Sequence, residues 1–172
     1  MPTQAIDVLD TAVKIGLGAV ITGVSTYLVA ISSHNREIQK AKIKRRQEML
    51  EDIAEKVELF TNSALRYYAA MMDHARSSDK TPELTVEFDE RQESEKKDLR
   101  ANYRELSSAE AKLLLLGHNR CQELVRDYGE SLADFYGKRW TSVSEEEARG
   151  YRELILKKRE QIFKELQKNY NA

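Results

Sequence analysis

Residues that interrupt helices are scarce in this chain of 172 residues, which holds two prolines and seven glycines. Three of the glycines, Gly16, Gly18 and Gly23, lie in one apolar stretch near the N-terminus, so the rest of the chain is nearly free of helix breakers. Charged residues make up 33% of the chain. This composition favours long helices and disfavours a β-rich fold, so we expect an all-α protein.

Residues that carry recognisable chemistry are also few. Cys121 is the single cysteine, which excludes an intrachain disulfide and suits a reducing compartment. His118 lies three residues before it, but two potential ligands are too few for a metal site. No nucleophile elbow and no phosphate-binding loop occurs outside the apolar stretch. We therefore expect no catalytic residue, metal, cofactor or evident small-molecule substrate; an enzyme with an unrecognised site is the least favoured alternative.

No excess of basic charge marks the body of the chain. The net charge is −1, and residues 1–46 hold seven Lys or Arg against three Asp or Glu, which leaves a net charge of −5 for residues 47–172. A nucleic-acid module needs a basic face for phosphate contacts. The acidic body therefore argues against nucleic acid as a partner.

One stretch, Ile15 to Ile31, contains no charged residue at all. Seventeen residues in a helix span about 26 Å, slightly less than the ~30 Å hydrocarbon core of a bilayer, and the flanking residues extend it. We predict a transmembrane helix over residues 14–33, preceded by a short lead, residues 1–13, on the non-cytoplasmic side. A cleaved signal segment and a buried soluble helix are the alternatives.

A basic juxtamembrane segment, residues 34–46, follows the apolar stretch. Its six cations, here called the basic collar, are Arg36, Lys40, Lys42, Lys44, Arg45 and Arg46. Such a cluster fixes its side of the span in the cytoplasm. We therefore predict a single-pass protein of the cell membrane with its N-terminus outside and its C-terminal body cytoplasmic. Anionic lipid headgroups are possible partners of the collar.

The apolar stretch also contains a series of small residues at helical spacing. This small-residue stripe consists of Gly16, Ala19, Thr22, Gly23 and Thr26. Small side chains let two membrane helices approach closely, so the stripe predicts association with a protein partner or with a second copy of the chain.

The body, residues 47–172, shows the periodicity of packed helices. A heptad seam recurs over Leu50, Ile53, Val57, Phe60, Ala64, Tyr67 and Met71. We predict helices over about residues 36–77, 89–137 and 144–170, joined as a cytosolic antiparallel bundle or coiled coil of about three long helices. The middle range is one helix, or two with the second beginning near Ser107, which has capping-box spacing with Glu110.

The links between these helices carry weaker signals. Residues 77–89 predict a loop or a short extended piece, because residues 84–88 alternate as in a strand; Thr81 followed by Pro82 is a competing helix start. Ser144 and Glu147 predict a capped start for the last helix. The run from Leu113 to Leu116 covers all sides of a turn, so we expect it to be the most enclosed part of the bundle or to face a second chain.

Taken together, these features predict a membrane-anchored helical interaction or scaffold protein that recruits or assembles a partner at the cytoplasmic membrane face. The alternative is an oligomeric effector of the toxin or defence type that perturbs the membrane itself, with a polar lining drawn from the apolar stretch.

Overall fold

The computed structural model describes residues 3–76, 81–137 and 144–170, and it describes side chains in these ranges except those of residues 3–21, 74, 75, 82, 83 and 134. The described residues form four helices and no strand, so the prediction of an all-α protein is confirmed. The helices are α1 (Thr3–Arg76), α2 (Pro82–Leu115), α3 (Asn119–Gly137) and α4 (Glu145–Tyr170). The chain divides into two compact units, Met1–Arg45 and Arg46–Ala172.

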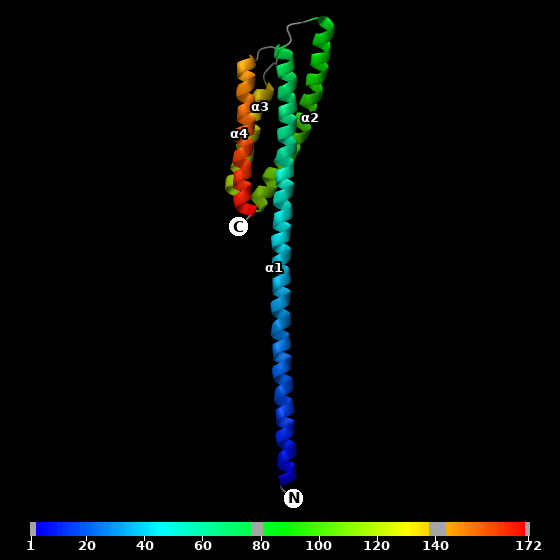
Figure 1. Cartoon of the computed structure of the whole chain (residues 1–172), viewed down its shortest axis with the longest axis vertical. Coiled ribbons are helices and arrows are strands. Elements are labelled where there is room, and N and C mark those ends of the chain that lie inside the picture. Colours follow the sequence, from blue (N-terminus) through cyan, green and yellow to red (C-terminus); the bar gives the residue numbers. More distant parts are fainter. Residues whose placement is uncertain (1–2, 77–80, 138–143, 171–172) are drawn as a thin grey trace. The chain divides into compact units, whose positions relative to one another are not determined.

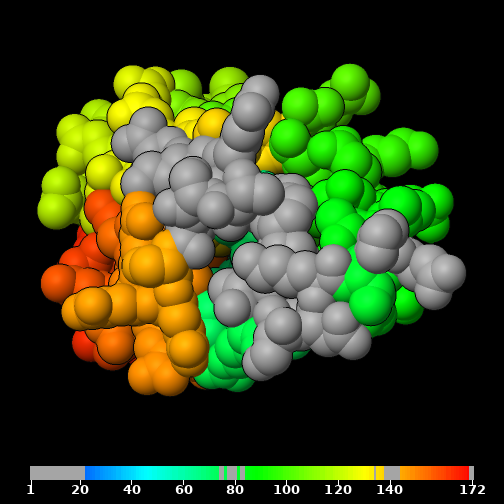
Figure 2. Space-filling model, turned by 90° about the horizontal axis from the view of Figure 1, so that it is seen from above, coloured from blue at the N-terminus to red at the C-terminus, as the bar shows by residue number. Residues whose placement is uncertain are grey.

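The second unit is a bundle of the last part of α1 with α2, α3 and α4, which run side by side (Figure 1). Tyr67 of α1 packs edge-on against Phe135 of α3, and Phe60 packs against Tyr128 in the same ascending order, so α1 and α3 are parallel. The other neighbouring helices are antiparallel. In the view along the bundle, α2 and α4 lie on opposite sides (Figure 2). The arrangement is an up-down-up-down four-helix bundle.

The heptad seam supplies the α1 side of the bundle core. All seven seam residues are buried, with exposed fractions between 0% for Ile53, Val57, Ala64 and Tyr67 and 4% for Met71. They pack against the inward faces of the other helices, which include Leu106, Val125 and Ile155. The chain's own core therefore buries the whole seam, which leaves no seam surface free for association with another chain.

Ion pairs fix the register between α1 and α2. Four clusters of opposite charge follow each other along the two helices in opposite directions: Asp52 with Lys112, Lys56 with Glu105, Arg66 with Glu95 and Asp98, and Asp73 with Arg91. Single exposed pairs contribute little, about 0–1 kcal/mol each. As a series, they favour one register over a shift by one helical turn.

The middle of the chain differs from the sequence prediction, because the predicted long helix over residues 89–137 is two helices that meet at residues 116–118 rather than near residue 107. Gly117 has a positive φ of 74°. Its N–H donates to the carbonyl of Leu114, and the N–H of His118 donates to that of Leu113, which is a Schellman termination. Ser107 lies inside α2, where its hydroxyl donates to the carbonyl of Tyr103.

The start of α2 also lies earlier than the prediction of a loop or extended piece over residues 77–89. Residues 82–89 are helical, with Thr81 as N-cap residue and Pro82 in the first turn, and residues 77–80 lie outside the described residues. Proline suits a first helical turn because it needs no N–H partner there, and this local signal outweighs the alternation of residues 84–88. The predicted cap of α4 is confirmed, since the N–H of Glu147 donates to the Ser144 hydroxyl at 3.1 Å.

No helix in the described part of the chain has both the length and the apolar character that a membrane crossing requires. Of the predicted transmembrane segment, residues 14–21 lie outside the residues whose side chains are described.

Two glycines give opposite stability predictions. Gly150 lies exposed inside α4, and a Cβ built there meets nothing within 4 Å, so Gly150→Ala is expected to raise the free energy of unfolding by about 0.5–1 kcal/mol. Gly117→Ala forces a side chain into the left-handed region and is expected to lower it by about 1–2 kcal/mol. Urea unfolding followed by circular dichroism measures both, and equal midpoints for the two variants would contradict the Schellman assignment.

Candidate functional site

The described part of the first unit consists of residues 22–45 of α1, all of them exposed. Large apolar side chains stand on this helix with exposed fractions of 54% for Val24, 60% for Leu28 and 41% for Ile31. Their spacing of four and three residues places these three on one side of the helix. In the bundle, by contrast, side chains of this kind form the core. Residues 24–31 therefore present an apolar side of α1 that the described part of this unit does not cover.

The small-residue stripe occupies a different side of the same segment. Thr22, Gly23 and Thr26 are exposed, while the side chains of residues 16 and 19, Gly16 and Ala19 in the predicted stripe, lie outside those described. The Thr26 hydroxyl donates to the Thr22 carbonyl at 2.8 Å. Because this hydrogen bond is made within the helix, Thr26 can pack against an apolar neighbour without leaving its hydroxyl donor unpaired.

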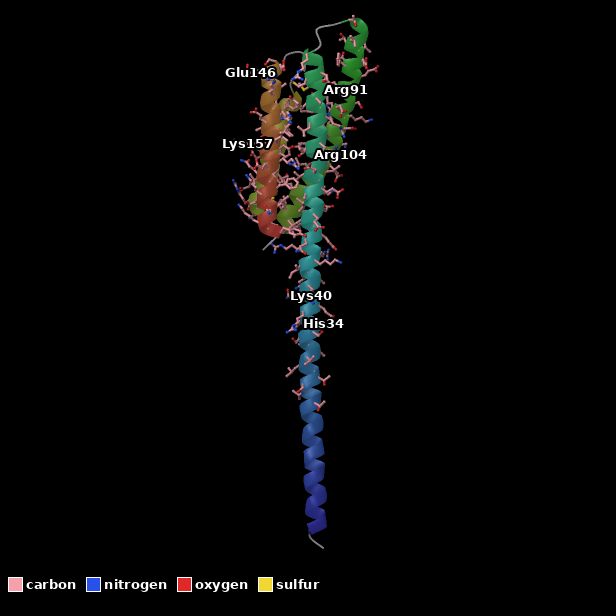
Figure 3. The ribbon with its side chains drawn as sticks, in the orientation of Figure 1. His34, Lys40, Arg91, Arg104, Glu146 and Lys157 are labelled. Atoms are coloured by element: carbon pink, nitrogen blue, oxygen red, sulfur yellow. The ribbon has the colours of Figure 1, made fainter. Side chains whose placement is uncertain are left out.

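The basic collar is placed in two environments. Arg36, Lys40, Lys42, Lys44 and Arg45 are exposed on the first unit, where Figure 3 shows Lys40 near His34 on α1. Arg46 instead belongs to the bundle, where its guanidinium donates to the carbonyl of Asn169 in α4 at 3.4 Å. Five of the six collar cations are thus exposed.

The Leu113–Leu116 run does not have the enclosure predicted for it. Leu113 is fully buried, but Leu114 is 51% exposed and Leu115 is 82% exposed. The Schellman turn at Leu116 ends α2 at this point. The side chains of Leu114 and Leu115 therefore lie at the corner between α2 and α3 and extend into solvent. The alternative prediction, that they face a second chain, stays a prediction.

Sequence reasoning missed a cavity between α1, α2 and α3. It has a volume of about 250 Å³, and its lining consists of Phe60, Leu99, Arg100, Tyr103, Leu132, Ala133 and Tyr136. Leu99 and Leu132 are buried at its inner end, whereas Arg100, Tyr103 and Ala133 are exposed. No local pattern in the sequence indicates it, because its lining residues come from three different helices.

Two cations of α2 lie over the ring of one lining residue, Tyr136 of α3. The Arg100 guanidinium lies 5.0 Å and the Lys96 ammonium 5.2 Å from the centre of the Tyr136 ring. The Tyr136 hydroxyl is buried and has no hydrogen-bond partner among the described residues. A buried hydroxyl without a partner lowers stability by about 1–3 kcal/mol.

Other titratable groups in the bundle show no arrangement for chemistry. No group of three or more potential metal ligands occurs among the residues with described side chains. Burial lowers the pKa of His118, with a smaller contribution from the nearby Arg46. Burial likewise raises the pKa of Tyr128, whose hydroxyl lies 2.9 Å from that of Thr61. These shifts follow from core packing.

Cys121 is expected to be unreactive in the folded protein. It is fully buried, and burial, followed by the charge of Glu165, raises its pKa from 9.0 to about 12. At pH 8 the thiolate fraction of Cys121 is therefore about 1,000-fold lower in the folded protein than in the unfolded chain. The buried neutral thiol favours the folded state below pH 9, and this contribution to the free energy of unfolding is lost as the pH rises from about 9 through 12. Labelling with iodoacetamide tests this: modification at equal rates in native buffer and in denaturant contradicts the buried thiol.

Comparison of the chain with protein-family models, with curated proteins and with solved structures gives no match.

Proposed function

We propose that this chain is a single-pass membrane-anchored interaction protein, which assembles a partner or a second copy of itself at the cytoplasmic membrane face. The observation that carries the proposal is the uncovered apolar side of α1, formed by Val24, Leu28 and Ile31. Water-soluble chains rarely expose such a continuous apolar surface. Hydrocarbon covers it if residues 14–33 cross the bilayer.

The exposed collar cations support the orientation of this anchor. Arg36, Lys40 and Lys42 lie within a few turns of the end of the apolar stretch, on its C-terminal side. Basic residues at that place resist translocation, and each contributes about 1 kcal/mol of attraction to an anionic leaflet. The proposal therefore has the bundle in the cytoplasm and the N-terminal lead outside.

The small-residue stripe is the proposed surface for association. The heptad seam is buried in the chain's own core, so it does not serve this purpose. A Cβ added at Gly23 meets nothing within 4 Å, which leaves room for a second helix to approach the backbone closely. The side of α1 that carries Leu28 then faces lipid.

Cysteine cross-linking in membranes tests the association. Because Cys121 is buried, introduced cysteines are the only accessible thiols among the described residues. Under a mild oxidant, Gly23→Cys and Thr26→Cys are expected to form disulfide-linked dimers, while the control Leu28→Cys on the lipid side is not. Cross-linking at all three positions alike indicates random collision and contradicts the stripe.

The identity of the partner is tested by affinity purification from mildly solubilised membranes, followed by mass measurement of the intact complex. We expect a homo-oligomer or a complex with a second protein. A lone monomer that purifies with nothing else contradicts the interaction function. Depolarisation of cells that express the chain, lost on Gly23→Leu, favours the membrane-perturbing effector instead.

A further inference from the structure

The corner between α2 and α3 holds two leucines that the bundle does not cover. Leu115 is 82% exposed, more than any other large apolar side chain in the described part of the chain, and Leu114 beside it is 51% exposed. Their neighbours Leu113 and Leu116 pack against the core. The Schellman turn that follows fixes the backbone at this point. The turn thus presents the two leucines to solvent in one defined conformation, which lowers the entropy cost of binding through them.

This corner lies at the end of the bundle at which α4 ends (Figure 1). Arg46 is close enough to His118 for its charge to contribute to the lowered pKa of that imidazole. The Arg46 guanidinium also donates to the carbonyl of Asn169, near the end of α4. Because Arg46 is the first residue of its unit, the corner is at the end of the bundle from which the chain continues into residues 1–45, the unit of the proposed anchor.

The charges next to the leucine pair are balanced within the chain. The cations nearest to it in the sequence are Lys112 and Arg120. Lys112 pairs with Asp52 of α1 at 2.6 Å, and Arg120 pairs with Glu123 at 3.1 Å. A corner that docks on an anionic bilayer needs cations beside its apolar residues that are free to bind headgroups. A neutral apolar pair instead fits an identical pair, because no like charges are brought together.

We propose that Leu114 and Leu115 pack against the same two leucines of a second copy of the chain in the membrane. This inference rests on the proposed function, because a shared anchor gives both copies the same orientation. Copies that insert in the same direction and form a closed dimer are related by a two-fold axis along the membrane normal. Equivalent residues then lie at equal height above the bilayer, so each leucine pair meets its own equivalent.

The small size of the leucine contact makes it dependent on the anchor. Four leucine side chains bury on the order of 300 Å² in all, whereas a stable interface between free partners buries about 1,200–2,000 Å². The contact alone therefore does not hold two chains together in solution. A shared tether in the membrane raises the effective concentration of one corner near the other to roughly the millimolar range, in which a small apolar contact forms.

Disulfide cross-linking of the purified full chain, reconstituted into phosphatidylcholine vesicles, tests the contact. These vesicles hold no other protein, so a cross-link reports a second copy of the chain. Under a mild oxidant, we expect Leu115→Cys to form disulfide-linked dimers at least fivefold faster than Val86→Cys. Val86 is the matched control, because it is an apolar residue, 56% exposed, near the other end of the same helix. Equal rates for the two variants indicate random collision and overturn the contact.

The Gly23→Cys variant, measured in parallel, distinguishes failure of this contact from failure of the proposed function. Cross-linking of Gly23→Cys without an excess at Leu115→Cys overturns the corner contact and leaves the proposed function in place. Cross-linking of Leu115→Cys without cross-linking of Gly23→Cys supports the corner contact and contradicts association through the stripe.

A charge variant tests the contact without a disulfide at the corner. Leu114→Glu with Leu115→Glu brings like charges together, so we expect dimer formation by Gly23→Cys to slow at least threefold. Both leucines are exposed, so the bundle is expected to stay folded, which circular dichroism checks. Leu59→Glu with Val86→Glu is the matched control on exposed positions elsewhere in the bundle, and it is expected to leave the rate unchanged. Equal slowing in both double variants overturns the contact.

Dilution of the chain in the membrane separates a second copy from lipid as the occupant. An environment-sensitive fluorophore on Leu115→Cys is expected to emit at shorter wavelength in vesicles with many chains and to lose this shift at fewer than one chain per vesicle. A shift that persists on dilution shows that the corner enters lipid, and it overturns the proposal.

Discussion

Replacing Val24 and Tyr27 together by arginine is expected to release the chain from the membrane. Both side chains are exposed on α1, at 54% and 66%, and both lie near the middle of the proposed span. An arginine at the centre of a membrane helix opposes insertion by about 2.5–3.5 kcal/mol, so the pair opposes it by roughly 5–7 kcal/mol. Flotation of cell membranes in a density gradient measures the effect and separates vesicle-bound chain from aggregate.

The matched control places the same two charges on the bundle. Leu59 and Val86 are also exposed apolar residues, at 44% and 56%, and lie in the second unit. Leu59→Arg with Val86→Arg is expected to float with the membranes as the unmodified chain does. If the Val24 and Tyr27 variant floats equally well, residues 14–33 are not the anchor.

Phe60→Ala is expected to lower the free energy of unfolding of the bundle by about 3–5 kcal/mol. The Phe60 ring is 1% exposed and packs edge-on against Tyr103 and Tyr128, with ring centres 5.8 and 5.3 Å away. Its removal takes away both contacts and enlarges the neighbouring cavity, which the surrounding helices only partly refill.

Denaturant unfolding of the full chain in mild detergent, followed by circular dichroism, measures the change for Phe60→Ala. Leu59→Ala is the control, since Leu59 is the neighbouring residue and is 44% exposed, and it is expected to change stability by less than about 0.5 kcal/mol. Similar losses for the two variants show that the seam does not form the core.

Local signals in the sequence predict much of the bundle. The absence of glycine and proline predicts helices, and the cap at Ser144 follows from a spacing of three residues. Where two local signals compete, the sequence alone does not decide. Gly117 ends α2 because its positive φ completes a Schellman turn, while the spacing of Ser107 and Glu110 predicts a start that the helix does not use.

The candidate site depends on contacts between residues distant in the sequence, which explains why the sequence does not reveal it. Phe60, Arg100 and Tyr136 lie at least 36 positions apart, and only the order of the helices brings them to one cavity. Likewise, the exposure of Leu115 follows from the position of the corner between α2 and α3, and no periodicity in the chain specifies it. Only the apolar stretch of α1 is visible directly, because it is continuous.

The ion pairs between α1 and α2 have a further property. Read along α1, the signs at positions 52, 56, 66 and 73 are minus, plus, plus and minus, which is a palindrome. A parallel α2 would match the same signs, since position 52 would then meet 91, 56 would meet 95, 66 would meet 105 and 73 would meet 112. The charges therefore encode spacing without encoding polarity.

The short connection between α1 and α2 excludes the parallel arrangement that these charges allow. A parallel α2 of 34 residues would have to return along about 51 Å, whereas the five residues between Arg76 and Pro82 reach at most about 20 Å. The short connection thus makes α2 antiparallel to α1. The charge pattern along the two helices is compatible with either direction.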